Sequence, residues 1–254
     1  MICVRFVERR LSVSNINILQ RTMSAIENKV ANMRIDYGVN SSFQSTLPSK
    51  DPYEWFKLWF QEAVEHPGVG EPNAMSLSTA SSDGTPSCRY VLLKGYSDKG
   101  FRFFTNYLSQ KGQDLTENPK AALTFYWEPL RMQIRINGDV ERLSNEESTE
   151  YFHSRPFSSQ ISALVSKQTT VLPKNWCLKD KMCELTEQYK GKIVPKPHYW
   201  GGYLVKPHSF EFWCGGSARL HDRIRFRKQG KGEVVDEQLV SMGENGWLYE
   251  RLSP

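Results

Sequence analysis

The sequence AMSLSTASSDGTPSCRYVLLK, at residues 74–94, has the pattern of a β-hairpin. Residues 74–80 and 87–94 predict two strands of half-buried character. The turn between them contains Asp83-Gly84, a pair typical of tight connections between antiparallel strands. This stretch therefore predicts that the fold is built on an antiparallel sheet.

The rest of the chain mixes further short strands with helices. In the strand predicted at 132–140, Ile134 and Ile136 alternate with polar residues, which suits a barrel wall beside a ligand. Capping residues and helical spacing predict the helices. The pattern indicates an α+β fold, an antiparallel barrel with helices packed outside. The other predicted strands lie at 101–105, 121–127, 200–205, 209–213, 223–227 and 247–252, and the predicted helices lie at 51–66, from 109, at 144–152, from 156 and at 173–190.

The composition excludes several classes of protein. No run of about 18 apolar residues occurs, so no membrane-spanning helix is expected. The net charge of +5 favours an anionic ligand, but acids and bases are interspersed, which argues against a nucleic-acid surface. The five cysteines form no Cys-x-x-Cys pair, so free thiols and no metal site are expected. No glycine-rich phosphate loop is present, so side chains and helix N-termini must hold any phosphate.

The N-terminal 33 residues differ from the rest. Four arginines stand against a single acid in residues 1–21, which resembles a weak mitochondrial transit segment. A disordered leader is the alternative interpretation. We therefore expect a leader at 1–33, a single domain at 34–254 and a cytoplasmic location, with a mitochondrial location left open by the arginines.

Two segments in the first half carry candidate anion-binding residues. Arg89 and Lys94 stand an odd number of positions apart, so they are predicted to face opposite sides of a strand and to serve two anions. Lys111 follows the predicted start of a helix at Ser109, where free N–H groups attract a phosphate. Solvated surface charges are the alternative for both segments.

Two further segments lie in the second half. Arg155 precedes a helix whose first turn includes Ser159, and its guanidinium fork suits a phosphate. Arg219, His221 and Arg223 alternate after a Gly-Gly loop and are predicted to share one face of a strand, where three such groups require an anion. A plain helix corner and a structural histidine are the alternatives.

Taken together, these segments resemble the pyridoxine (pyridoxamine) 5′-phosphate oxidase family. The similarity runs from about Arg34 to Pro254 in order and without large gaps. It is carried by RYVLLKG at 89–95, FRFFTN at 101–106, FYWEPL at 125–130, YFHSRP at 151–156, SSQI at 158–161, VSKQ at 165–168, VPKPHYWGGY at 194–203, EFW at 211–213, RLHDR at 219–223 and WLYERLSP at 247–254.

The resemblance implies a split-barrel FMN-binding fold and a homodimer with FMN at the subunit interface. Residues 200–254 would then form a C-terminal dimerisation and active-site segment. It also implies the reaction: pyridoxine 5′-phosphate and pyridoxamine 5′-phosphate are oxidised to pyridoxal 5′-phosphate with O₂ as acceptor, and hydrogen peroxide is released. Neither a nucleic acid nor a membrane is an expected partner.

By position, the resemblance also implies the roles of single residues. Arg219 and His221 would act at the pyridine ring of the substrate, and Arg34 and Tyr37 match a segment that closes over the site. The substrate phosphate would be held by Lys94, Tyr151, Arg155 and Ser159, the FMN phosphate by Arg89 and Lys111, and the rest of the FMN site would comprise Tyr90, Val91, Leu92, Phe104, Thr105, Gln110, Gln133, Gln168, Thr169, Trp213 and Arg223.

Two departures from the family pattern stand out. Gln110 replaces an arginine that usually contacts the FMN phosphate, and the loop 214–218 lacks the usual polar residues. The first predicts weaker FMN binding, and the second altered loop packing. A flavoprotein with other chemistry, such as a flavin reductase, and a non-catalytic carrier of FMN or pyridoxal phosphate are the rival interpretations, with a nucleic-acid module further behind.

Overall fold

The chain divides into two units, residues 1–37 and 38–254. The sheet, the helices around it and the candidate site belong to the second unit. The division predicted at residue 33 stays a prediction, and Arg34 lies outside the described residues. The computed structural model describes residues 29–33, 35, 37 and 47–254.

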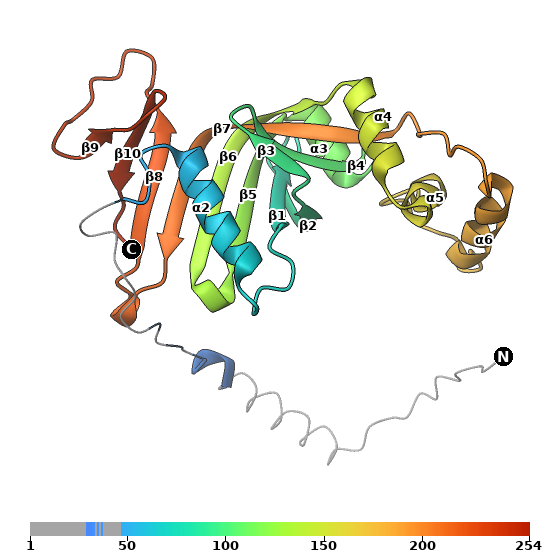
Figure 1. The fold of residues 1–254 in the computed structure, drawn as a ribbon, viewed down its shortest axis with the longest axis horizontal. Coiled ribbons are helices and arrows are strands. Elements are labelled where there is room, and N and C mark those ends of the chain that lie inside the picture. The colour runs from blue at the N-terminus through green and yellow to red at the C-terminus, as the bar shows by residue number, and fades with distance from the viewer. Residues whose placement is uncertain (1–28, 34, 36, 38–46) are drawn as a thin grey trace. The chain divides into compact units, whose positions relative to one another are not determined.

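The second unit is built on one antiparallel ten-stranded sheet (Figure 1). Its order is β2-β1-β5-β6-β7-β8-β10-β9, and β4 pairs with both β3 and β7. This path has two ends, so the sheet is open rather than closed, and the predicted α+β antiparallel class is confirmed. The strands are β1 Ala74–Ala80, β2 Pro86–Leu92, β3 Gly95–Ser97, β4 Gly100–Asn106, β5 Lys120–Trp127, β6 Met132–Arg142, β7 Trp200–Cys214, β8 Asp222–Lys228, β9 Val240–Met242 and β10 Trp247–Arg251.

Strand β7 connects the two halves of the sheet. The sequence predicts two strands at 200–205 and 209–213, but β7 is a single strand of 15 residues that pairs first with β4 and then with β8 (Figure 1). Pro207 inside it cannot donate a ladder hydrogen bond. The register of β6 shifts between Asn137 and Gly138, opposite this proline, and a Cβ at Gly138 would lie 2.4 Å from a β7 carbonyl oxygen. A bulge at His208 of β7, beside the glycine of β6, therefore lets β7 continue past Pro207.

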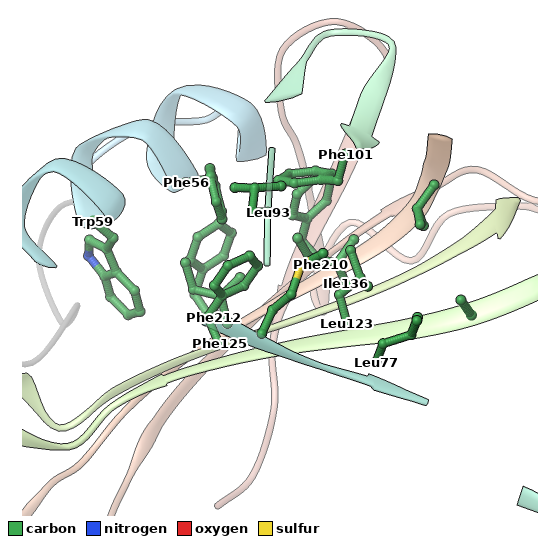
Figure 2. Packing of buried hydrophobic residues seen from close by; sticks show 14 of the residues in the cluster. Phe56, Trp59, Leu77, Leu93, Phe101, Leu123, Phe125, Ile136, Phe210 and Phe212 are labelled. Atoms are coloured by element: carbon green, nitrogen blue, oxygen red, sulfur yellow. The ribbon is translucent and has the colours of Figure 1, made fainter. Parts of the chain in front are cut away.

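Helix α2 (Pro52–Glu65) covers one face of the sheet with aromatic side chains. Asp51 caps it by accepting a backbone N–H at 2.7 Å. The Trp55 ring stacks on Phe212 of β7, with ring centroids 4.4 Å apart. Each such side chain contributes about 1.5–3 kcal/mol of stability on full burial. Figure 2 shows the surrounding core, in which Phe56 and Trp59 of α2 belong to one cluster with Leu77, Leu93, Phe101, Leu123, Phe125, Ile136, Phe210 and Phe212.

A smaller apolar cluster packs α4 (Asn145–Ser154), α5 (Phe157–Val165) and α6 (Leu178–Tyr189) against the start of β7. Phe152 and Ile161 are fully buried in it and pack with Trp200, at the start of β7. Ser144 and Glu147 form the predicted capping box. The helix predicted from 173 begins only at Leu178, because the preceding residues form a separate turn. The helices are α3 Gln110–Glu117, α4 Asn145–Ser154, α5 Phe157–Val165 and α6 Leu178–Tyr189, with short 3₁₀ turns at Glu128–Leu130 and Ser217–Arg219. No helix in the described part of the chain is long and apolar enough to span a membrane.

Candidate active site

A cavity of about 520 Å³ gathers most of the predicted site residues. Strands β2 and β4 form one part of its wall, and the start of α3 and the end of α4 form another. Its polar lining includes four cationic side chains, whereas no acidic side chain lines it. The lining residues are Arg89, Tyr90, Val91, Leu92, Lys94, Phe104, Thr105, Gln110, Lys111, Tyr151, Arg155, Gln168, Thr169 and Trp200.

The Arg89 guanidinium is held from behind by a polar network. Its Nη1 donates to the Thr79 hydroxyl at 2.7 Å, and its Nη2 donates to the Ser87 hydroxyl. Both hydroxyls donate in turn to Oδ2 of Asp114, at 2.5 and 2.9 Å. Burial alone would raise the pKa of the Asp114 carboxyl, but hydrogen bonds from Thr79, Gln110 and Ser87 and the charge of Arg89 lower it. The network therefore keeps Asp114 ionised and Arg89 oriented.

Lys111 is a buried cation without an ion-pair partner among the described residues. Lys111 is only 7% exposed, and its Nζ donates to Ser109 Oγ at 3.1 Å and to Gln168 Oε1 at 3.2 Å. Burial and the charge of Arg89 lower the pKa of Lys111 to about 8, although Asp114 opposes this. A bound anion would stabilise the charged form of this lysine and raise its pKa again.

The first turn of α3 is linked to the loop after α5. The backbone N–H of Gln110 donates to Thr169 Oγ1 at 3.3 Å, while its side-chain Nε2 donates to Asp114 Oδ1 at 2.8 Å. Thr169 has a φ of 75°, which is unusual for a residue other than glycine and costs about 1–3 kcal/mol. Strained residues of this kind gather at functional sites, so Thr169 supports the assignment of this loop to the site.

Arg155 is the cation of a second group of contacts. Its guanidinium lies over the Trp200 ring, 4.7 Å from the centroid, and its Nη1 is buried without a hydrogen-bond partner. Burial lowers the pKa of Arg155, although Tyr151 opposes this. Tyr151 in turn stacks on Phe104 at a centroid distance of 3.8 Å. An aromatic wall thus holds a desolvated guanidinium that no acid among the described residues neutralises.

Lys94 and Arg89 border the same cavity, so the prediction that they serve opposite sides of a strand is wrong. The physical reason is that β2 ends at Leu92. The N–H of Lys94 instead pairs with the carbonyl of Arg102, which places Lys94 in a connection where strand alternation no longer applies.

The remaining predicted residues do not line this cavity. Gln133, Trp213 and Arg223 stand side by side on β6, β7 and β8, and the Trp213 ring contacts His221 at a centroid distance of 4.8 Å. Arg223 Nε donates to the buried Glu211 at 2.9 Å. This second cluster belongs to the C-terminal part of the sheet. Ser159 lies in the first turn of α5, and Tyr37 belongs to the first unit.

The prediction that Arg219, His221 and Arg223 share one strand face is wrong. Ala218 and Arg219 have φ angles of 52° and 64°, which an extended strand excludes, and β8 begins only at Asp222. The Gly216 N–H donates to His221 Nδ1 at 3.1 Å and closes the loop. Arg219 is therefore an exposed side chain on a turn.

Sequence reasoning missed Trp200 and Asp114. Trp200 stands in the segment at 194–203 that carries part of the family resemblance, but nothing local indicates that it supports Arg155. Asp114 stands four residues after Gln110, so helical spacing already places the two on one face. Its burial arises from contacts with β1 and β2, which local pattern does not reveal.

Known proteins match this chain over most of its length. Residues 60–188 match the family described as pyridoxamine 5′-phosphate oxidase. Residues 200–254 match the pyridoxine 5′-phosphate oxidase C-terminal dimerisation region, which supports the predicted homodimer. The pyridoxine/pyridoxamine 5′-phosphate oxidase of Bombyx mori is 50% identical over 229 residues, 89% of each chain. The pyridoxine-5′-phosphate oxidase of Bos taurus is 50% identical over 87% of this chain and 86% of its own.

Solved structures are similar as well. PhzG from Burkholderia lata 383, in complex with tetrahydrophenazine-1-carboxylic acid, has a TM-score of 0.71 and 31% identity, covering 82% of this chain and 94% of its own. A pyridoxamine 5′-phosphate oxidase-related FMN-binding protein from Nostoc punctiforme has a TM-score of 0.60 at 14% identity over 80% of this chain and 98% of its own, a likeness of fold alone. Two matched regions that cover most of the chain and relatives at 50% identity establish that this chain belongs to the pyridoxamine 5′-phosphate oxidase family.

Proposed function

We propose that this protein is an FMN-dependent oxidase that converts pyridoxine 5′-phosphate and pyridoxamine 5′-phosphate to pyridoxal 5′-phosphate. The observation that carries the proposal is one cavity lined by four cationic side chains, Arg89, Lys94, Lys111 and Arg155, and by no acidic side chain. A flavin mononucleotide and a phosphorylated vitamin bring one phosphate each. The names of relatives at 50% identity support the same activity.

Arg89 and Lys111 fit the phosphate of FMN. Lys111 is buried without an ion-pair partner among the described residues, and its lowered pKa reflects a charge that a bound phosphate would stabilise. Arg89 supplies a second charge, and the start of α3 adds backbone N–H groups. We assign the phosphate to Arg89 and Lys111. The further proposed FMN contacts within this chain are Tyr90, Val91, Leu92, Phe104, Thr105, Gln110, Gln168 and Thr169.

Arg155 and Lys94 fit the phosphate of the substrate. Arg155 has a buried Nη1 that lacks a partner, and burying such a donor without a hydrogen bond costs about 1–3 kcal/mol. A phosphate oxygen would supply the missing acceptor. Lys94 and the Tyr151 hydroxyl border the same cavity, and Ser159 lies one turn further along the chain in α5. We assign the substrate phosphate to these four side chains.

In this proposal, the second cluster of one subunit completes the cavity of the partner subunit. Trp213, Arg219, His221 and Arg223 belong to the segment that matches the C-terminal dimerisation region, and Gln133 lies next to Trp213 in the sheet. None of them lines the cavity of its own chain. A homodimer with FMN at the subunit interface would bring each cluster to the other subunit's cavity. The role of Arg34 and Tyr37 stays an expectation from the family resemblance.

The chemistry follows from this division of roles. FMN supplies the two-electron redox chemistry when it is bound. The C–OH or C–NH₂ group of the substrate loses two electrons and two protons. O₂ accepts the two electrons and two protons and leaves as hydrogen peroxide. For the amine substrate, water then hydrolyses the resulting imine to the aldehyde and ammonia. The protein clamps a remote phosphate to fix the reacting carbon, an effect of orientation. Arg219 and His221 are proposed to lie at the pyridine ring, where a cation stabilises charge on the ring oxygen.

An anaerobic titration tests this function. Pyridoxamine 5′-phosphate should bleach the yellow absorbance of the FMN-loaded protein, and admission of O₂ should restore it. A flavin that stays oxidised with both phosphorylated vitamins, yet is reduced by a carboxylated tricyclic compound of the kind bound to PhzG, would favour the rival flavoprotein instead. A protein that binds no flavin would contradict both.

The composite site has its own test. Subunits with Lys111→Ala and subunits with His221→Ala should each form dimers of low activity. Mixed dimers made by refolding the two together should regain one intact site, because the two substitutions then fall into the same defective site. Absence of any recovery would place both residues in the same subunit's site.

A further inference from the structure

Asp114 is a buried carboxylate beside the two cations assigned to the FMN phosphate. Asp114 is only 2% exposed, and its Oδ2 lies 3.9 Å from Arg89 Nη2. Its negative charge also acts on Lys111. An acid in this position repels a bound phosphate, so the acid needs a role that outweighs the repulsion.

The direction of the hydrogen bonds around Asp114 indicates that role. A carboxylate can only accept, so the hydroxyl protons of Thr79 and Ser87 must both point to Oδ2. The lone pairs of the two hydroxyls then face Arg89, whose Nη1 and Nη2 donate to them. The 3.2 Å contact between the two hydroxyl oxygens cannot be a hydrogen bond as well, because each hydroxyl has one proton.

The same network leaves Arg89 able to bind a ligand. Its guanidinium donates to the Leu77 carbonyl, Thr79 and Ser87, which fixes the plane of the group. A guanidinium carries more N–H donors than these contacts use. If the hydroxyl groups of Thr79 and Ser87 were free to rotate, their protons could point at Arg89. The guanidinium would then lose its two acceptors and would no longer be held in this position.

We infer that Asp114 is a positioning residue that holds Arg89 for the phosphate of FMN by fixing the hydroxyls of Thr79 and Ser87. The inference rests on the proposed function, because it takes FMN as the ligand. It makes a prediction with a definite sign. Removal of a negative charge near a phosphate should tighten FMN binding if charge alone matters, whereas loss of the positioning of Arg89 should weaken it.

The experiment compares FMN with riboflavin, which lacks the phosphate. Both are titrated into apoprotein, and binding is followed by the change in flavin fluorescence. Asp114→Ala should raise the Kd of FMN roughly five- to thirty-fold, and the isosteric Asp114→Asn should change it in the same direction by less. The Kd of riboflavin should change less than about twofold. A general loss of structure would affect both ligands equally, so the ratio of the two Kd values isolates the phosphate.

Two controls make the result decisive. Glu117→Gln removes an exposed carboxylate from the same helix, and this carboxylate also accepts a hydrogen bond from a serine hydroxyl. The substitution should leave the Kd of FMN unchanged or slightly lower. In an Arg89→Ala background, Asp114→Asn should no longer weaken FMN binding, because the residue through which it acts is gone.

Several results would overturn the inference alone: FMN binding that is unchanged or tighter in both Asp114 variants, an equal loss for riboflavin, or a further loss on top of Arg89→Ala. Wild-type protein that fails to bind FMN would instead overturn the proposed function.

Discussion

The guanidinium of Arg155 lies over the indole ring of Trp200, 4.7 Å from its centroid. This contact holds a cation at the cavity wall without neutralising it, since an aromatic face attracts the charge but accepts no strong hydrogen bond from it. The arrangement keeps the guanidinium donors available for an anion. It therefore leads to a kinetic prediction about the substrate phosphate.

Arg155→Ala should raise the KM for both phosphorylated substrates by about 10- to 100-fold with a much smaller change in kcat. A phosphate clamp acts in the ground state and the transition state alike, so its loss appears mainly in KM. Arg155→Lys should recover part of the loss, because it keeps the charge but not the fork. Steady-state kinetics would contradict the assignment if kcat fell while KM stayed constant.

Arg219→Ala and His221→Ala should lower turnover per bound flavin much more than they lower FMN content. Arg219 is exposed on a turn and the His221 ring contacts Trp213, and both belong to the segment that matches the dimerisation region. In the proposed function they act at the pyridine ring rather than at a phosphate. Single-turnover reduction of bound flavin measures the effect. Loss of flavin with unchanged turnover per remaining FMN would assign the two residues to cofactor binding.

The affinity for FMN should fall as the pH rises through about 8. Burial lowers the pKa of Lys111 to about 8 in the free protein, and only its protonated form attracts the phosphate. If the bound phosphate raises that pKa well above 9, the Kd should increase about tenfold between pH 7 and pH 9. Fluorescence titration across this range measures it. Lys111→Arg should flatten the profile, because a guanidinium stays charged.

The same pKa has the opposite consequence for stability. Without ligand, the folded protein binds fewer protons at Lys111 than the unfolded chain does between pH 8 and the usual value of 10.5. The contribution of this lysine to the free energy of unfolding should therefore rise with pH over that range. Chemical denaturation of apoprotein and of Lys111→Met, which has no titratable group there, would separate this contribution from the rest. Equal pH dependence in the two proteins would contradict it.

Gln110→Arg should tighten FMN binding a few-fold at low salt. The side chain lines the cavity but donates its amide to Asp114 at 2.8 Å, so a guanidinium there adds charge that Asp114 partly neutralises. The gain should shrink at high salt because of screening. Hydride transfer should hardly change. Equal affinities at low salt would mean that residue 110 acts only on Asp114, and the contact expected from the family would be wrong at this position.

Local patterns predicted much of the fold for physical reasons. The alternation of Ile134 and Ile136 and the capping box at Ser144 depend on neighbours in sequence, and both are observed. The continuity of β7 through Pro207 depends on a bulge at His208 and on its pairing with Gly138 of β6, which no local pattern contains. The turn at Arg219 depends on left-handed backbone angles that alternating charges do not reveal.

The site was less accessible to local reasoning. Patterns in the sequence identified its cations, but their roles came from resemblance to a family, and Lys94 shares a cavity with Arg89 only because β2 ends early. The network behind Arg89 joins β1, β2 and α3, so burial of Asp114 required the tertiary structure.

The central claim is tested most directly by product stoichiometry. Purified protein loaded with FMN is incubated with pyridoxine 5′-phosphate or pyridoxamine 5′-phosphate in air, and pyridoxal 5′-phosphate, hydrogen peroxide and O₂ uptake are measured together. We expect one peroxide and one O₂ for each pyridoxal 5′-phosphate formed, with no turnover of the unphosphorylated vitamins at the same concentration. Flavin-loaded protein that forms no pyridoxal 5′-phosphate from either substrate would contradict the proposed function.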